Sequence, residues 1–230
     1  MSSPTEIKVM GSAAIKEAYL ELVPQFEHAS GHKVITTWTG GVDIVKRISA
    51  GELTDMVMQS ASAVDGLIKL GKLAQGSRID IATSWVAVAV KQGAPKPDIS
   101  SGDALKRALL AAKSVAYSTG PSGVYLIELF KRMGIADQIQ HKVTQIKGEP
   151  VGAAVARGEA EIGFQQMSEL LPVSGIDIIG PLSPDIQQVT TFSAGIHANT
   201  KVAEAARELA NFFKAPAAHP VIRRKGMEPA

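Results

Sequence analysis

Residues 81 to 90 read I-A-T-S-W-V-A-V-A-V, a long apolar and β-branched run that predicts an extended strand. A second such run covers residues 187 to 196. Short β-turn-α units precede the first run, and a further set of these units lies between the two runs. Units of this kind are typical of a parallel sheet with helices packed on it.

Two β/α blocks separated by two long extended segments predict a specific chain path. The chain would cross to a second lobe near residue 82 and return near residue 194, so that the last helices complete the first lobe. We therefore expect an α/β protein with one lobe from residues 1–83 and 195–230 and another from residues 84–194. A ligand would bind in the cleft between the lobes, at the carboxyl ends of the strands. A single doubly wound domain is the alternative.

The composition narrows the functional classes. Hydrophobic residues make up 45% of the 230 residues, which is enough for two cores, and the formal net charge is only +2. The longest basic run is Arg223-Arg224-Lys225, so the sequence shows no footprint for nucleic acid. The chain has no cysteine, which excludes disulfides, thiolate catalysis and cysteine-type metal sites.

Two cellular locations are compatible with the sequence. It contains no apolar stretch of the roughly 18 to 20 residues that a membrane crossing needs. Met1-Ser2-Ser3-Pro4 runs directly into the first expected strand and shows no secretory signal. The protein is therefore expected to be either cytoplasmic or the mature form of an exported protein, and we favour a mature periplasmic protein.

The stretch from Tyr117 to Tyr125, Y-S-T-G-P-S-G-V-Y, joins an expected strand to an expected helix. The first backbone N–H groups of a helix have no partner within it, and the helix dipole makes this end positive. Small hydroxyls beside these groups favour an anion. We therefore expect Ser122 and Gly123 to contact an anionic ligand.

Similar small, polar turns follow other strands in both halves of the chain. Each turn alone is explained equally well by helix capping, but one cleft would gather them all. Their lack of Lys and Arg favours an anion that is held by neutral donors and released again. The candidate ligand residues in the first lobe are Gly11, Ser12, Thr39, Gly40, Gly41 and Ser60.

The pair Gln165-Gln166 directly follows an expected apolar strand. Both amides would therefore lie at the end of this strand, and we expect at least one of them to contact the ligand. No histidine pair has metal-ligand spacing, and no nucleophile elbow or nucleotide-binding glycine motif occurs. His28 and His32 flank a helix end, where we expect surface capping roles. We accordingly assign no catalytic residue, no metal site and no cofactor.

Four stretches resemble bacterial molybdate-type periplasmic substrate-binding proteins, and the resemblance covers nearly the whole chain. They are V-M-G-S-A-A-I at residues 9–15, T-G-G-V-D-I-V-K-R-I at 39–48, A-G-E-L-T-D-M-V-M at 50–58 and A-R-G-E-A-E-I-G-F at 156–164. The resemblance implies the type II periplasmic-binding fold: two α/β lobes, two crossover strands, and an oxyanion held in the cleft by hydroxyl and N–H groups.

The resemblance also implies ligand contacts at particular positions. They fall at Ser12, at Thr39 or Gly40, at Ser122 and near the backbone of Val151. Gln166 stands where molybdate binders carry a tyrosine, and Gly40-Gly41 stands where they are serine-rich. These departures favour a different or larger anion, such as an organic carboxylate.

The expected function is therefore capture of a small anion by a monomeric, exported solute-binding protein that delivers it to the membrane subunits of an ABC importer. Lobe closure would bend residues 82–84 and 193–196. The alternative is the aconitate isomerase branch of the resemblance, which moves a proton on a tricarboxylate. Because no turn supplies Arg or His, the sequence favours capture over catalysis. A transcriptional effector domain shares the fold, but the chain has no DNA-binding segment.

Overall fold

The computed structural model describes residues 4 to 230. Met1 to Ser3, which bear on the expected absence of a leader, lie outside the described residues. The chain forms two compact units. Unit 1 contains the chain up to Ser84 and again from Thr190 to Ala230, and unit 2 contains Trp85–Val189.

Unit 1 is built on a sheet whose central strand, β1, pairs in parallel with two neighbours. The strand order is β2-β1-β3-β9, and β9 runs antiparallel to β3. The short strand β10 pairs with the first half of the long strand β4. The strands of this unit are β1 (Glu6–Ser12), β2 (Lys33–Thr39), β3 (Met56–Ser60), β4 (Ile79–Lys91), β9 (Val189–Ile196) and β10 (Glu228–Pro229).

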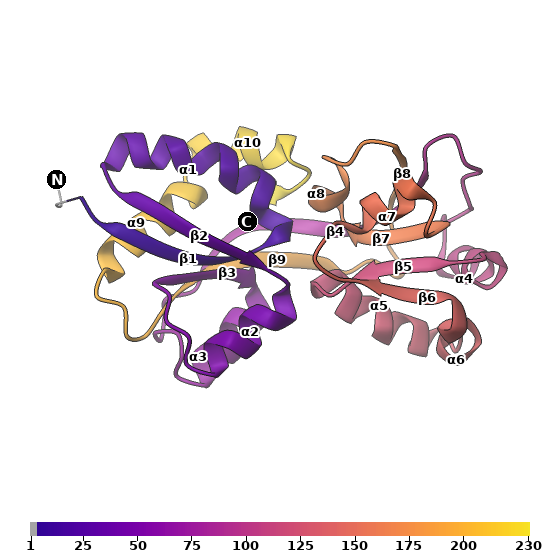
Figure 1. Ribbon diagram of the computed structural model, residues 1–230, viewed down its shortest axis with the longest axis horizontal. Coiled ribbons are helices and arrows are strands. Elements are labelled where there is room, and N and C mark those ends of the chain that lie inside the picture. The colour runs from indigo at the N-terminus through magenta and orange to yellow at the C-terminus, as the bar shows by residue number, and fades with distance from the viewer. Residues whose placement is uncertain (1–3) are drawn as a thin grey trace. The chain divides into compact units, whose positions relative to one another are not determined.

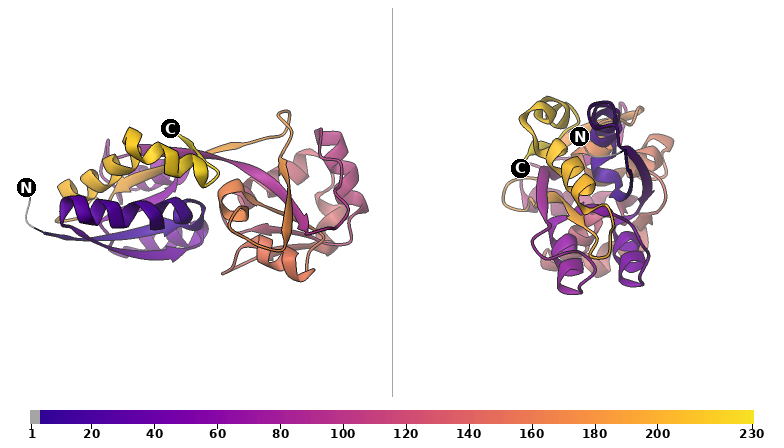
Figure 2. Two further views of the ribbon diagram at one scale, coloured as in Figure 1. Left: turned by 90° about the horizontal axis from the view of Figure 1, so that it is seen from above. Right: turned by 90° about the vertical axis from the view of Figure 1, so that its left-hand side faces the viewer.

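Helices cover both faces of the unit 1 sheet (Figure 1). On one face, α1, α9 and α10 pack on one another and on the strands, as the views in Figure 2 also show. The other face is covered by α2 and α3. Their bounds are α1 (Lys16–Ser30), α2 (Gly41–Ser49), α3 (Ala61–Lys69), α9 (Ala203–Lys214) and α10 (His219–Arg224).

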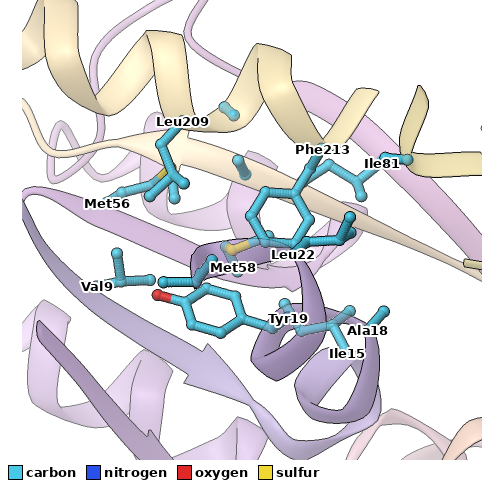
Figure 3. Packing of buried hydrophobic residues seen from close by; sticks show 14 of the residues in the cluster. Val9, Ile15, Ala18, Tyr19, Leu22, Met56, Met58, Ile81, Leu209 and Phe213 are labelled. Atoms are coloured by element: carbon cyan, nitrogen blue, oxygen red, sulfur yellow. The ribbon is translucent and has the colours of Figure 1, made fainter. Parts of the chain in front are cut away.

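The larger core of unit 1 lies under α1 and α9 (Figure 3). Tyr19 stacks on Phe213 with ring centroids 5.4 Å apart, Met58 lies beside the Phe213 ring, and Met56 lies beside Leu209. Aromatic and flexible apolar side chains bury a large area each, so this cluster fixes α1 on the sheet.

Unit 2 repeats this plan. Its central strand, β5, pairs in parallel with β6 and β7, and β4 runs antiparallel to β7. The strand β8 pairs with β4. Helices α4, α5 and α6 pack on one face and α7 and α8 on the other. The bounds are α4 (Gly102–Ala111), β5 (Val115–Ser118), α5 (Pro121–Arg132), α6 (Ala136–Ile139), β6 (Val143–Ile146), α7 (Val151–Arg157), β7 (Ile162–Gln166), α8 (Met167–Leu170) and β8 (Ile176–Pro181).

The repeated plan decides where the predicted ligand residues lie in each unit. In each unit three parallel strands end at one edge of the sheet, and each end leads toward a helix: β1, β2 and β3 in unit 1, and β5, β6 and β7 in unit 2. Within residues 4 to 230, no helix has both the length and the apolar character that a membrane crossing requires.

Several local predictions were wrong. Gly11 and Ser12 belong to β1 and not to a turn after it, because parallel pairing with β2 holds both residues in the sheet. Ser60 ends β3 and α3 begins at Ala61, so no turn separates them. His32 was expected at the surface but is fully buried, with Nδ1 accepting a hydrogen bond from the N–H of Thr5 at 3.2 Å.

Candidate functional site

The first group of predicted ligand residues lies at the carboxyl edge of the unit 1 sheet. Ser12 and Thr39 are the last residues of adjacent strands and stand opposite each other in the register. Gly11 is opposite Met58, which brings Ser60 to the same edge two residues further along β3. Ser12 and Ser60 are buried, and Thr39 is half-buried. The structure thus places three hydroxyl groups at one sheet edge.

The predicted glycines of unit 1 serve close packing at this edge. A Cβ atom on Gly11 would lie 2.7 Å from the ring of Trp38, and one on Gly41 would lie 2.5 Å from Nε2 of Gln59. Gly40 caps α2, and its carbonyl accepts from the N–H of Ile44 at 3.0 Å. These glycines therefore set the close approach of the segments that carry Ser12 and Thr39.

Lys16 is a candidate site residue that the sequence analysis missed. Its Nζ atom lies 5.9 Å from the centroid of the Trp38 ring, and the same ring packs against Gly11. Lys16 is half-buried and begins α1, where the helix dipole disfavours a cation. Among residues 4 to 230, no acidic side chain forms an ion pair with it. An anionic ligand group at this edge would offset that cost.

The second group lies where β5 leads into α5 in unit 2. The hydroxyl oxygens of Ser118 and Ser122 are 3.1 Å apart, and Ser122 is fully buried. A Cβ atom on Gly123 would lie 1.8 Å from the carbonyl oxygen of Ser118, so the helix reaches this strand only because residue 123 is glycine. Pro121 has no N–H group, which leaves the N–H groups of Ser122 and Gly123 as the first donors of α5.

The third group connects the end of β7 to the start of α7. The N–H of Val151, a predicted ligand contact, donates to Oε1 of Gln165 at 2.7 Å. Nε2 of Gln165 in turn donates to Oε1 of Glu169 at 2.8 Å. Gln166 is fully buried and is the last residue of β7. A chain of hydrogen bonds therefore joins the Val151 amide to a carboxylate through a glutamine.

Glu169 is the second residue that the sequence analysis missed. Burial raises the pKa of its carboxyl group to about 7, against the opposing effect of hydrogen bonds from the Gln165 side chain and the Gln166 backbone. A carboxyl group with this pKa exchanges a proton near neutral pH. Glu169 lies four residues after Gln165 on a short helix, so a search of the turns alone could not find it.

The family model for bacterial extracellular solute-binding proteins matches residues 7–228. The chain belongs to this family. It is 41% identical over 98% of its length to a protein named aconitate isomerase from a Pseudomonas species, and it covers 88% of that relative. It is 28% identical over 96% of its length to the molybdate-binding protein ModA of Azotobacter vinelandii, of which it covers 89%. The predicted resemblance to molybdate-type binding proteins is therefore confirmed.

Solved structures bear on the fold of this family member. The periplasmic molybdate-binding protein of Azotobacter vinelandii superimposes with a TM-score of 0.77 at 20% identity, covering 96% of this chain and 98% of the other. The predicted α/β architecture of the type II periplasmic-binding fold is confirmed. The assignment of a ligand to the ten predicted residues stays a prediction.

Proposed function

We propose that this solute-binding protein binds a small tricarboxylate of the aconitate type and interconverts its cis and trans isomers. The observation that carries this proposal is the 41% identity to aconitate isomerase over nearly the whole chain, against 28% to the molybdate-binding relative. Two departures point the same way: Gln166 and Gly40-Gly41 replace the tyrosine and the serine-rich loop expected of a molybdate binder.

The chemistry of the candidate residues supports a carboxylate ligand. Three carboxylates on one small molecule require several hydrogen-bond donors and benefit from a cation. Unit 1 offers the hydroxyls of Ser12 and Thr39 and the unpaired ammonium group of Lys16, while unit 2 offers Ser122 and the first amides of α5. The sequence predicted that neutral donors alone hold the anion, and we now add the Lys16 ammonium group to them.

We further propose that the donors of both units act on one ligand, as in the predicted lobe closure, with bending in residues 82–84 and 193–196. The protein would work in the periplasm as a monomer. These statements extend the assignment of the chain to the family of bacterial extracellular solute-binding proteins.

A second candidate function is capture of an oxyanion for an ABC importer without any reaction. The similarity to ModA favours it, and the neutral hydroxyl donors suit a tetrahedral anion. In that case the chain would present its ligand to the membrane subunits of the importer and would show no turnover.

The two functions separate in one set of measurements on the purified chain. Nuclear magnetic resonance follows interconversion of cis- and trans-aconitate, and calorimetry measures binding of molybdate, tungstate, sulfate, phosphate and the saturated propane-1,2,3-tricarboxylate. Turnover with tricarboxylate binding supports the isomerase. Tight molybdate binding without turnover replaces it with the importer component, and binding of no anion in the panel would exclude both.

Ser122→Ala is expected to weaken tricarboxylate binding by about 10-fold, since a hydrogen bond to a charged group contributes about 1.5–3 kcal/mol. The control is Ser174→Ala, which removes an exposed hydroxyl from the same unit. Calorimetry with propane-1,2,3-tricarboxylate measures both variants. An unchanged dissociation constant for Ser122→Ala removes this residue from the site.

A further inference from the structure

The carboxyl group of Glu169 lies among residues that the sequence analysis assigned to the ligand. Oε1 of Glu169 is 2.8 Å from Nε2 of Gln165, whose Oε1 accepts the Val151 N–H at 2.7 Å. The carboxyl group also accepts from the backbone N–H of Gln166. Glu169 therefore contacts both of the last two residues of β7. Through Gln165 it is also connected to Val151, the first residue of α7.

A capping role explains part of this arrangement. A glutamate at the third position of a helix often accepts from the N–H of the residue before the helix, and Glu169 stands in this relation to Gln166. However, α8 has only four residues, and a cap at an exposed helix end is normally solvated. The Glu169 side chain is instead half-buried, and its burial raises the pKa of the carboxyl group, which costs free energy that a cap does not require.

The charges around Glu169 do not explain its burial. Strand β7 carries no titratable side chain, and the charged residue of α7 is Arg157. The Arg157 guanidinium group forms ion pairs with Oε1 of Glu149 at 2.7 Å and with Oε1 of Glu159 at 2.6 Å. Among the described residues no cation pairs with Glu169, so its carboxyl group keeps the capacity to accept and return a proton.

We propose that Glu169 is the general base and acid of the isomerisation, and this inference rests on the proposed isomerase function. The Glu169 carboxylate removes a proton from the methylene carbon of the tricarboxylate. The C–H electron pair enters the allylic system, and the negative charge spreads onto the substrate carboxylates. The Glu169 carboxylic acid then returns the proton to the former vinylic carbon, and the double bond moves by one position.

The step is balanced without any further reactant. One C–H bond breaks and another forms, nothing is oxidised or reduced, and Glu169 ends in its starting form. Gln165 holds the carboxyl group in place through the 2.8 Å hydrogen bond, which makes Gln165 a positioning residue. A general base of this kind contributes about 10²- to 10⁴-fold to a rate.

The test compares Glu169→Gln with the intact chain. The kcat for aconitate interconversion is expected to fall at least about 100-fold, while the dissociation constant of propane-1,2,3-tricarboxylate changes less than about threefold. Glu128→Gln is the matched control, because Glu128 is exposed on α5 in the same unit, and it should keep the full rate. Glu169→Asp keeps the carboxyl group one carbon further back and is expected to restore part of the rate.

The pH profile gives a readout that a purely structural role would not produce. The base form of Glu169 predominates above a pKa of about 7, so the rate of the intact chain should fall as the pH drops below 7. The residual rate of Glu169→Gln should not show this decrease at low pH. An intact chain that isomerises aconitate while Glu169→Gln keeps its rate overturns the assignment of Glu169 alone. An intact chain that binds tricarboxylate without turnover overturns the proposed function and this inference together.

Discussion

Gly123→Ala is expected to destabilise unit 2 by about 3 kcal/mol, the upper part of the usual range for overpacking. The added methyl group would lie 1.8 Å from the carbonyl oxygen of Ser118 and 2.9 Å from its carbonyl carbon, which are backbone atoms of β5. Because backbone in a paired strand cannot yield as a flexible side chain does, α5 has to move away. The movement would separate Ser122 from Ser118 and weaken tricarboxylate binding as well.

Urea unfolding followed by circular dichroism measures the stability change. Gly66→Ala is the control, since a Cβ atom at this position in α3 meets nothing within 4 Å. Alanine is favoured over glycine inside a helix by about 0.5–1 kcal/mol, so the control should be slightly more stable than the intact chain. Equal stability of Gly123→Ala and the intact chain would show that the contact between α5 and β5 relaxes without cost.

Lys16→Met is expected to weaken binding of propane-1,2,3-tricarboxylate by about 10- to 100-fold, because charge-assisted hydrogen bonds are worth about 1.5–3 kcal/mol. Methionine keeps the length and the apolar packing over Trp38 but removes the ammonium group. The fold should tolerate the change, since a cation at the first position of α1 opposes the helix dipole.

Calorimetry at low salt measures this effect, and Lys69→Met in the same unit is the control because Lys69 is exposed at the end of α3. Lys16→Arg keeps the charge and is expected to retain most of the affinity. Tricarboxylate binding that is unaffected in Lys16→Met would remove the cation from the site and return the ligand contacts to neutral donors alone.

Much of the fold was predictable because its signals are local. The apolar run of residues 81 to 90 lies within β4, which extends from Ile79 to Lys91, and the glycine at position 31 ends α1 in a left-handed conformation. Periodicity and turn chemistry depend on neighbouring residues, so they can be read along the chain. The short elements α6 and β10 were not predicted, because four and two residues are too few to show a periodic pattern of apolar residues.

The candidate site was predictable only in part. The small polar residues that end β1, β2 and β3 were found because each directly follows an apolar run. The prediction for His32 was wrong, and Lys16 and Glu169 were missed. The surroundings of these three side chains come from partners that are distant in sequence or from burial. For Lys16 a local signal exists: a cation in the first turn of a helix, where acidic residues are preferred.

The amino-acid sequence alone was sufficient to predict the α/β class, the two long strands and the family. These features depend on patterns of apolar, small and glycine residues that repeat along the chain. The tertiary structure decided the surroundings of the charged and polar groups that we propose as the site. Packing set the distance between Lys16 and Trp38, placed the Val151 N–H within hydrogen-bond distance of Gln165, and raised the pKa of the half-buried Glu169 carboxyl group. The energy of a charge depends on its solvation and on its neighbours in space, and neither quantity exists before the chain folds.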